Sequence, residues 1–457
     1  MGRKDPDMIR GPLFPAIVRY TVPIILTSLL QLTFNAADMI VVGRFCGSIS
    51  VAAVSATGPI SFLIINLFIG LSIGSGVTVA QAIGAGEHHT IRKLVHTSIL
   101  TAFLGGLALA GLGILLSRKV LIWTDTPEDV MSLALVYMRL YFLGTPLNLT
   151  YNFSASILRA AGDTRTPLWV LTLSGIANVV LNVIFVVIFR MNVAGVALAT
   201  VLSQGLSAAL AIRVLARRAD ACAVHLKQLR IHREELRQIL RIGLPAGIES
   251  ALHTLSNVMI QTAVNSFGSV FMSGNAAACS IEGFEYVMMT AFQQTAMNFA
   301  GQNLGAKRYD RVKKTVQLCL VCTVAVAWVV TPVILFFGRD LLGLYITDSE
   351  EAISYGMIRL IFSCVPYFLC GMNNVSTGAL RGIGKSAVPM ITSLIGICGF
   401  RMFWIGTVFQ LPRFHTPAGL YVSYAISWIL TFSAQITIFF LLYRKITAEN
   451  RPEGKLP

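Results

Sequence analysis

Long apolar segments separated by short polar ones run through almost the whole chain. Segments 98–116, 316–337 and 428–443 approach or exceed the ~20 residues that an α-helix needs to cross a bilayer. The alternation of apolar and polar positions that is typical of outer-membrane barrel strands is absent from the sequence. The pattern therefore predicts an all-α integral membrane protein.

Twelve transmembrane helices are predicted along the chain. The first apolar segment is too long for the hydrophobic part of a signal peptide, and no small-residue cleavage site follows it, so we interpret it as a retained first helix. The predicted spans are 16–42, 51–83, 94–117, 130–157, 168–189, 194–215, 238–266, 275–304, 315–337, 352–379, 388–410 and 418–443.

Composition and charge agree with a membrane protein. Hydrophobic residues make up 55% of the chain and charged residues only 12%, about half of the charged fraction found in soluble domains. Of the 36 lysines and arginines, 27 lie at the termini or in every second junction between helices. Because basic residues collect on the cytoplasmic side, we expect both termini in the cytoplasm. The same distribution explains the net charge of +15 without a nucleic-acid partner.

An internal repeat extends over the whole sequence. The segment QAIGA at 81–85 returns as QNLGA at 302–306, and the Leu-Arg, Gly and Pro positions of 158–167 return in 380–389. Two further blocks repeat at similar offsets, 220 and 224 residues. Blocks at a nearly constant offset indicate duplication of one unit.

The duplication predicts two six-helix bundles of parallel orientation. Six is an even number, so both copies enter the membrane in the same direction and are related by a pseudo-two-fold axis along the membrane normal. We assign residues 1–220 to the first bundle and 221–457 to the second. A basic linker at about 213–241 has a helical period, and we expect it to lie on the cytoplasmic membrane surface.

Polar residues form a stripe on the first predicted helix. Gln31, Asn35 and Asp38 follow Thr27 at spacings of four, four and three residues, which places them on one helix face. A charge in hydrocarbon costs several kcal/mol unless it faces protein, a partner or water, so Asp38 is a candidate functional group. Hydrogen bonding between helices is the alternative role for such a stripe.

Polar positions on neighbouring helices extend this candidate site. Asn178 and Asn182 are four residues apart on the fifth predicted helix, and Thr200 lies on the sixth. With Asn35, they are candidates for hydrogen-bond partners of Asp38 at an ion-coupling site.

The repeat places a second polar stripe on the seventh helix. Glu249, His253 and Asn257 correspond to Thr27, Gln31 and Asn35 at an offset of 222 residues. Two matched stripes are what a polar cavity between the halves would need. We therefore list Gln31, Glu249, His253 and Asn257 as candidate substrate-binding residues.

Acidic residues also occur inside the eighth predicted helix. Glu282 and Glu285 share one face, and Arg401 lies deep in the eleventh helix. A structural ion pair between Arg401 and Glu282, or Glu285, would neutralise both charges. The two glutamates remain candidate substrate groups, together with Met289 on a pliable apolar path, although plain core packing would also explain the methionine.

Motifs of enzymes and cofactor sites are missing from the sequence. The chain has no G-x-x-x-x-G-K-[ST], no G-x-S-x-G and no H-E-x-x-H. Cys319 and Cys322 are spaced as C-x-x-C, but within an apolar span without His or acidic neighbours. We therefore expect no enzyme activity, no cofactor and no metal site, apart from a possible Na⁺ near Asp38.

These residues resemble the multidrug and toxic compound extrusion (MATE) family over nearly the whole chain. The specific matches are NAADMIVVGR at 35–44, LRAAGD at 158–163 and the repeated glutamine-glycine blocks; GNAAACSIEGF at 274–284 resembles a bacterial branch. The resemblance implies proton- or sodium-coupled export of organic cations, with Asp38 as the coupling residue and Asn178 and Thr200 around it.

One departure from the family bears on the coupling ion. Some members carry an acid on the tenth helix, where this chain has Asn373 and Asn374. The absence of that acid favours proton over sodium coupling.

The sequence thus predicts a monomeric secondary antiporter that exports amphipathic organic cations in exchange for H⁺ or Na⁺ by alternating access. The alternative is a flippase or exporter of lipid-linked precursors or other polar metabolites from the same superfamily. A major-facilitator antiporter is disfavoured because segment 84–93 lacks its basic loop signature. A membrane receptor or scaffold would bind ligands without exchanging them.

Overall fold

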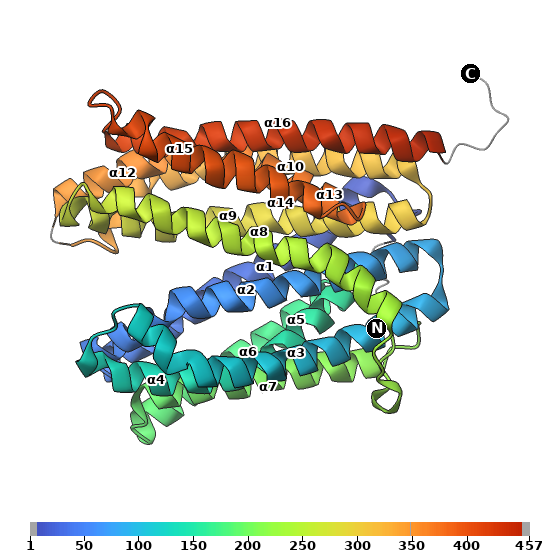
Figure 1. Ribbon diagram of the computed structural model, residues 1–457, viewed down its shortest axis with the longest axis horizontal. Helices are drawn as coiled ribbons and strands as arrows, with labels where there is room; N and C mark the ends of the chain where they lie inside the picture. The colour runs from blue at the N-terminus through green and yellow to red at the C-terminus, as the bar shows by residue number, and fades with distance from the viewer. Residues whose placement is uncertain (1–6, 348, 450–457) are drawn as a thin grey trace. The chain divides into compact units, whose positions relative to one another are not determined.

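The computed structural model describes residues 7–347 and 349–449, except for the side chains of residues 48 and 59–64. Helices form the regular structure throughout this part of the chain, in agreement with the predicted all-α class (Figure 1). The elements are α1 (Leu13–Phe45), α2 (Ser48–Ala85), α3 (His88–Trp123), α4 (Glu128–Leu143), α5 (Thr145–Ala160), α6 (Arg165–Asn182), η1 (Val183–Ile188), α7 (Asn192–Ala216), η2 (Leu226–Gln228), α8 (Arg233–Asn265), α9 (Ser269–Gly305), α10 (Tyr309–Phe336), α11 (Gly338–Gly343), α12 (Glu350–Cys364), α13 (Tyr367–Gly382), α14 (Ala387–Ser393), η3 (Leu394–Gly399), α15 (Phe400–Gly406), η4 (Val408–Gln410) and α16 (Pro417–Glu449).

Twelve helices or helix pairs correspond to the predicted spans. By length and composition, eight helices in the described residues could each cross a membrane, and two bent pairs raise this number to ten. The other two are α8 and α9, which are 33 and 37 residues long but carry more polar side chains. Each predicted span coincides with one of these elements, so the twelve-helix prediction is confirmed.

Two predicted spans are bent in the middle. The segment predicted as one helix over 130–157 consists of α4 and α5, and the chain bends by 44° between them. The segment 352–379 consists of α12 and α13, with a bend of 45°. Proline follows each first helix, as Pro146 and Pro366. Because proline lacks an N–H group and its ring collides with a carbonyl one turn earlier, it bends a helix. The two prolines are repeat partners, so the bend was duplicated with the unit.

Glycines with the same unusual backbone conformation occur at equivalent positions of the two repeat copies. Gly47 and its repeat partner Gly268 have φ of 83° and 93°, and Gly162 and Gly384 have φ of 96° and 80°. Positive φ is accessible to glycine at little cost because it has no Cβ. The same left-handed turns therefore connect equivalent helices in both halves.

Two compact units divide the described chain. Unit 1 is formed mainly by Val18–Ala251, and unit 2 contains Met8–Ile17 and the described residues from Leu252 onward. The divisions fall inside α1 and α8. They do not coincide with the bundle boundary that we placed after residue 220, which stays a prediction.

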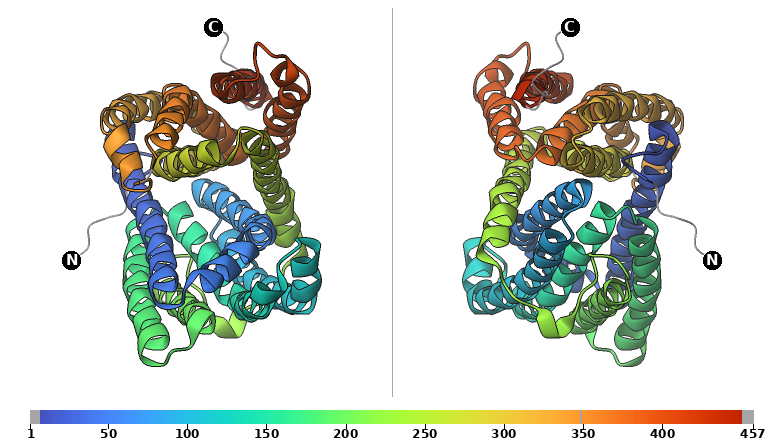
Figure 2. Two further views of the ribbon diagram at one scale, coloured as in Figure 1. Left: turned by 90° about the vertical axis from the view of Figure 1, so that its left-hand side faces the viewer. Right: turned by 90° about the vertical axis from the view of Figure 1, so that its right-hand side faces the viewer.

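Within unit 1, α5 packs against α2, α3 and α7, and Figure 2 looks along these helices. Gly106 on α3 lies so close to the backbone of Pro146 that a Cβ there would overlap it, and Gly113 lies against the ring of Phe142. Small residues of this kind let helix backbones approach each other in a membrane. At these two glycines, α3 lies directly against the residues on either side of the bend between α4 and α5.

The linker between α7 and α8 folds against unit 1. Residues 221–224 are buried, the His225 N–H donates to His96 Nε2 at 3.1 Å, and the His232 N–H donates to Thr97 Oγ1 at 3.1 Å. Its only regular element is the short turn η2. The helix expected from the leucine period is therefore wrong, because these leucines belong partly to α8 and the linker is held by contacts with α3. Its position on the cytoplasmic membrane surface stays a prediction.

Within unit 2, α9 packs against α10, α12 and α13. Gly274 lies against the carbonyl of Ala352, and Gly378 lies against the carbonyl of Gln293, without room for a Cβ. These close approaches bring α12 and α13 onto α9, so that the acidic side chains of α9 are placed in the interior of the unit.

The crowding at Gly106 can be tested with a glycine of the same helix. We expect Gly106→Ala to lower the free energy of unfolding by ~1–3 kcal/mol, because overpacking forces backbone shifts. Gly111, also on α3, has open space at its Cβ position, so Gly111→Ala should leave stability unchanged or raise it. Denaturant unfolding of both variants in mild detergent measures the difference; equal effects would contradict the close α3–α5 contact.

Candidate functional site

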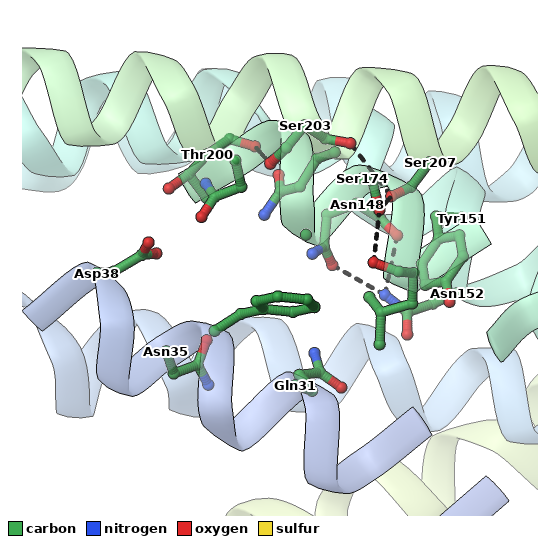
Figure 3. Close-up of a pocket in the computed structure, with 15 residues that line it drawn as sticks. Gln31, Asn35, Asp38, Asn148, Tyr151, Asn152, Ser174, Thr200, Ser203 and Ser207 are labelled. Atoms are coloured by element: carbon green, nitrogen blue, oxygen red, sulfur yellow. Dashed lines mark hydrogen bonds between the residues drawn. The ribbon is translucent and has the colours of Figure 1, made fainter. Parts of the chain in front are cut away.

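A polar pocket of about 110 Å³ lies among α1, α5, α6 and α7 of unit 1 (Figure 3). Amide and hydroxyl side chains dominate its wall, and Asp38 supplies a carboxylate. The lining residues are Gln31, Phe34, Asn35, Asp38, Asn148, Tyr151, Asn152, Leu171, Ser174, Gly175, Asn178, Thr200, Ser203, Gln204 and Ser207.

The polar stripe on α1 faces this pocket. Gln31, Asn35 and Asp38 all line it (Figure 3), as expected for residues spaced by four and three on one helix face. Phe34 also lines the pocket, and its ring lies so close to Gly175 that a Cβ on α6 would overlap it. Glycine at this position allows α6 to approach the aromatic ring of α1.

Asp38 is held by an amide from α6. Asn182 Nδ2 donates to Asp38 Oδ1 at 2.5 Å and lies 3.3 Å from Asn178 Oδ1. Asn182 is fully buried, and its own Oδ1 atom has no hydrogen-bond partner among the described residues. The predicted neighbours Asn178 and Asn182 are therefore brought to Asp38, and Thr200 lines the same pocket.

Several pocket residues were not identified from the sequence. Asn148 and Asn152 lie one turn apart on α5, joined by a 3.0 Å bond from Asn152 Nδ2 to Asn148 Oδ1. Ser207 of α7 donates to Ser174 Oγ of α6 at 2.6 Å. The spacing of four residues at 148 and 152 is the signal that could have found the α5 pair, since it matches the stripe on α1.

The size of the pocket restricts what it can hold in this conformation. Sites for drug-sized ligands typically measure about 300–1,000 Å³, whereas this pocket measures about 110 Å³. A pocket of this size has room for several water molecules or a small ion. Its arrangement suits exchange of a small ion at Asp38.

The predicted stripe on α8 does not contribute to this pocket. Glu249 is buried, Asn257 is exposed, and neither they nor His253 appear in the pocket lining. Glu249 lies in the part of α8 that belongs to unit 1, and His253 and Asn257 lie in the part that belongs to unit 2. Their assignment to a substrate cavity stays a prediction.

The ion pair predicted between Glu282 and Arg401 is wrong. Glu282 instead accepts two hydrogen bonds from Arg359 of α12, at 3.1 Å from Nε and 2.8 Å from Nη2. Arg359 Nη1 also donates to Asn275 Oδ1 at 2.5 Å, and the Tyr421 hydroxyl donates to the same oxygen at 2.8 Å. Because α9 packs directly on α12, Arg359 reaches the glutamate with a two-pronged geometry.

The remaining predicted groups of α9 lie in the interior of unit 2. Glu285 Oε1 accepts a hydrogen bond from Thr331 at 2.9 Å, and Thr323 Oγ1 lies 3.1 Å from the sulfur of Met289. Both α9 side chains are fully buried. Arg401 donates from Nε to a hydroxyl on α16. In the described residues, Arg401 therefore forms no ion pair with either glutamate, and Glu285 Oε2 has no hydrogen-bond partner.

Metal-binding clusters were searched for in the described residues. No group of three or more His, Cys, Asp or Glu side chains there could hold a metal ion. Any cation bound near Asp38 would therefore depend on one carboxylate and on neutral amide and hydroxyl oxygens.

Together, these features define a helical protein with many membrane spans and an ion-sized polar pocket inside one unit. Comparison with known proteins identifies its relatives. The MatE family model matches residues 23–184 and 245–404, which is more than half of the chain. The chain belongs to the MatE family, whose bacterial members include multidrug efflux transporters.

Individual relatives agree with this assignment over almost their full length. The chain is 26% identical to the Bacillus subtilis protein named "Probable multidrug resistance protein YoeA", over 90% of this chain and 91% of the relative. It is 23% identical to a protein of Shewanella oneidensis named "FAD transporter", over 86% of each. A crystal structure of the Vibrio cholerae MATE transporter VcmN, in mutant form, has the same fold, with a TM-score of 0.88 at 22% identity, covering 95% of this chain and 97% of that one.

The pair of Arg359 and Glu282 provides a test of the unit 2 interior. Arg359→Met should lower the free energy of unfolding by ~3–5 kcal/mol, because it leaves Glu282 buried without its cation. Adding Glu282→Gln to that variant should recover part of the loss. Arg339→Met serves as control, since its partner Glu350 is exposed at the surface, and such pairs contribute little. A double variant as unstable as the single one would contradict the proposed balance of charges.

Proposed function

We propose that this chain is a secondary active antiporter of the bacterial inner membrane, exporting amphipathic organic cations in exchange for H⁺ or Na⁺. The observation that carries the proposal is Asp38, a carboxylate on a membrane-spanning helix with an amide donor and an ion-sized polar pocket beside it. Ionisable groups are rare at such positions and mark ion or substrate pathways. Membership of a family of multidrug efflux transporters supports the direction of transport.

Asn182 supports reversible ion exchange at Asp38. An amide carries both a donor and an acceptor. In the present arrangement the Asn182 donor faces the carboxylate, whereas its acceptor oxygen has no partner in the described residues. A protonated Asp38 would need an acceptor, which rotation of the amide supplies. The pair can thus satisfy Asp38 in both protonation states.

Conformational change can begin at the helices that carry this pair. Pro23 interrupts α1 before the polar stripe, and the wide π-turns of η1 begin directly after Asn182. Proline kinks and π-segments are places where a helix can bend, and π-segments are common at functional sites. Neutralisation of Asp38 would remove its need for hydration, and bending of α1 would follow.

We infer an alternating-access cycle from these elements. Substrate enters from the cytoplasm, an external cation neutralises Asp38, and rearrangement of α1 and α8 releases substrate outward. Gln31, Glu249, His253, Asn257, Glu282, Glu285 and Met289 are the proposed substrate contacts. The distribution of basic residues supports a cytoplasmic position of both termini.

Export of a polar metabolite is a second candidate function. It is favoured by the relative named "FAD transporter", which aligns over 86% of this chain. Counterflow assays with ethidium and with a flavin nucleotide as alternative substrates distinguish the two candidates.

Asp38→Asn should abolish active efflux and leave the protein folded. Asparagine keeps the shape of the side chain but cannot exchange a proton or carry a charge, so ethidium transport in proteoliposomes should fall to the level of protein-free vesicles. Asp129→Asn, an exposed acid in the first turn of α4, is the matched control and should transport normally. Full ethidium export by the Asp38→Asn variant would refute the coupling role.

Separately imposed gradients identify the coupling ion. We expect a pH gradient without Na⁺ to drive ethidium exchange, with each pH unit supplying ~1.4 kcal/mol of driving force per proton. A single carboxylate paired with one amide can take up and release a proton, and it offers only one charged ligand to a metal cation. Transport driven by a Na⁺ gradient at equal pH, and not by a pH gradient, would assign Na⁺ to Asp38 instead.

A further inference from the structure

His96 of α3 joins this helix to the linker between α7 and α8, and both parts belong to unit 1. Its side chain is almost fully buried, with 4% of the residue exposed. Nε2 accepts a hydrogen bond from the backbone N–H of His225 at 3.1 Å, and Nδ1 lies 2.7 Å from the backbone carbonyl oxygen of Arg92. The rings of His96 and His225 are stacked, with their centres 6.2 Å apart. One ring nitrogen is thus bound within α3 and the other is bound to the linker.

The partners of the His96 ring require its neutral form. A carbonyl oxygen only accepts, so Nδ1 carries the hydrogen that points to Arg92, and a backbone N–H only donates, so Nε2 carries none. Protonation would add an N–H group at Nε2, directly opposite the N–H of His225. Two donors cannot form a hydrogen bond with each other, and a buried donor without an acceptor is costly. The protonated ring therefore cannot hold the linker in this arrangement.

His232, the other histidine of the linker that contacts α3, does not share this restriction. Thr97 Oγ1 accepts the His232 N–H at 3.1 Å, and it lies 3.3 Å from His232 Nδ1 and 3.4 Å from the carbonyl oxygen of Arg230. A hydroxyl group can both donate and accept. A protonated Nδ1 can donate to this hydroxyl, which then donates to Arg230. The contact survives protonation of His232, so the sensitivity to pH lies at His96.

A positive charge on His96 would also lack a counter-ion. No acid in the described part of the chain is bonded to its ring. Glu235 of α8 lies 3.8 Å from Lys93 instead, and Glu234 is exposed. The parts of α2 and α5 that pack on the linker are apolar. The other charged or titratable side chains on the linker after residue 220 and on the adjoining turns of α3 and α5 are Arg92, Arg159, His225, Lys227, Arg230 and His232.

The beginning of the linker is held by contacts that do not involve His96. Arg218 lies 3.9 Å from Asp163 of the turn between α5 and α6, and 2.7 Å from Asp220. These two acids are therefore already paired. Residues 221–224 follow and are buried against α2, α3 and α5. Loss of the His96 contact would free the linker from this point onward, while its start stays attached.

His96 lies near one end of a helix that is longer than the membrane is thick. At 1.5 Å per residue, the 36 residues of α3 extend about 54 Å, whereas the hydrocarbon layer measures ~30 Å. His96 follows Arg92 and Lys93 and precedes the apolar segment 98–116. Protons from the adjoining water can therefore reach the ring when the linker opens.

We propose that His96 is a pH-sensitive switch: its neutral ring holds the linker on α3, and its protonation releases the linker. The attached state is thus favoured at high pH and is lost as the pH falls. Because the linker leads directly into α8, the attached linker restrains a helix that rearranges in the proposed transport cycle. This consequence rests on the proposed export function: acidification on the linker side speeds exchange.

Alkylation of Cys222 measures release of the linker. Only 3% of this residue is exposed, and burial raises the pKa of its thiol to about 12, so it should react slowly while the linker is attached. A solvated imidazole titrates at ~6.5. If only the released linker binds this proton, the equilibrium shifts about tenfold between pH 7.5 and 5.5. Maleimide labelling of the purified protein, measured on the Cys222 peptide by mass spectrometry and normalised to unfolded protein at each pH, should rise about tenfold. An unchanged or falling ratio would overturn the switch.

Three variants assign the effect to one histidine. His96→Gln keeps an acceptor for the His225 N–H but cannot be protonated in this range, so Cys222 should stay protected at both pH values. His96→Leu removes the acceptor and should expose Cys222 at both. His89→Gln replaces an exposed histidine of the same helix and should behave as wild type. A wild-type pH response in either His96 variant, or protection of Cys222 in His96→Leu, would contradict the assignment.

Ethidium counterflow in proteoliposomes at equal pH on both sides tests the consequence for transport. Effects of pH on Asp38 are common to wild type and His96→Gln, so they cancel in the ratio of the two rates. This ratio should rise about threefold or more as the pH falls from 7.5 to 5.5, and a constant or falling ratio would overturn the regulatory role. If neither protein exchanges ethidium although Cys222 responds as expected, the export function fails whereas release of the linker is confirmed.

Discussion

The absence of water from the hydrocarbon interior is the constraint on which the rest of this structure depends. Every polar group placed there must find its partner within the protein. Hydroxyls meet the requirement locally, as where Thr27 donates to the carbonyl of Pro23. Charges need more elaborate partners, such as the two-pronged contact of Arg359 with Glu282. Asp38 is different, because only a neutral amide binds it among the described residues.

Local periodicity made the helices and a third of the pocket lining predictable. A span of ~20 apolar residues has few alternatives to a helix in a membrane, and spacings of three and four residues determine which side chains share a face. Gln31, Asn35 and Asp38 could therefore be placed together before any tertiary contact was known. Asn178 and Asn182 followed from the same rule on another helix. The rule succeeds because it depends only on the geometry of one helix.

Partner choice between helices could not be predicted in this way. The sequence offered Glu282 more than one arginine inside the predicted helices, and the close packing of α9 on α12 brings Arg359 to hydrogen-bond distance. The lining from α5, and that from α7 apart from Thr200, was missed because neutral amides and hydroxyls are common wherever membrane helices touch. The linker was misread because its leucines suggest a helix, while its backbone is bound by His96 and Thr97 of a distant segment.

Duplication explains why the scaffold repeats while its charges do not. The two halves share turn glycines, helix bends and a proline in the first helix of each copy. Yet the repeat position of Asp38 is Ile260, which is buried among apolar side chains in unit 2. Conversely, the buried pair of Arg359 with Glu282 belongs to unit 2, whereas Arg139, the repeat partner of Arg359, is exposed and lies 3.4 Å from Ser117 Oγ. Once a duplicated fold can satisfy its backbone unaided, each copy is free to retain different charges.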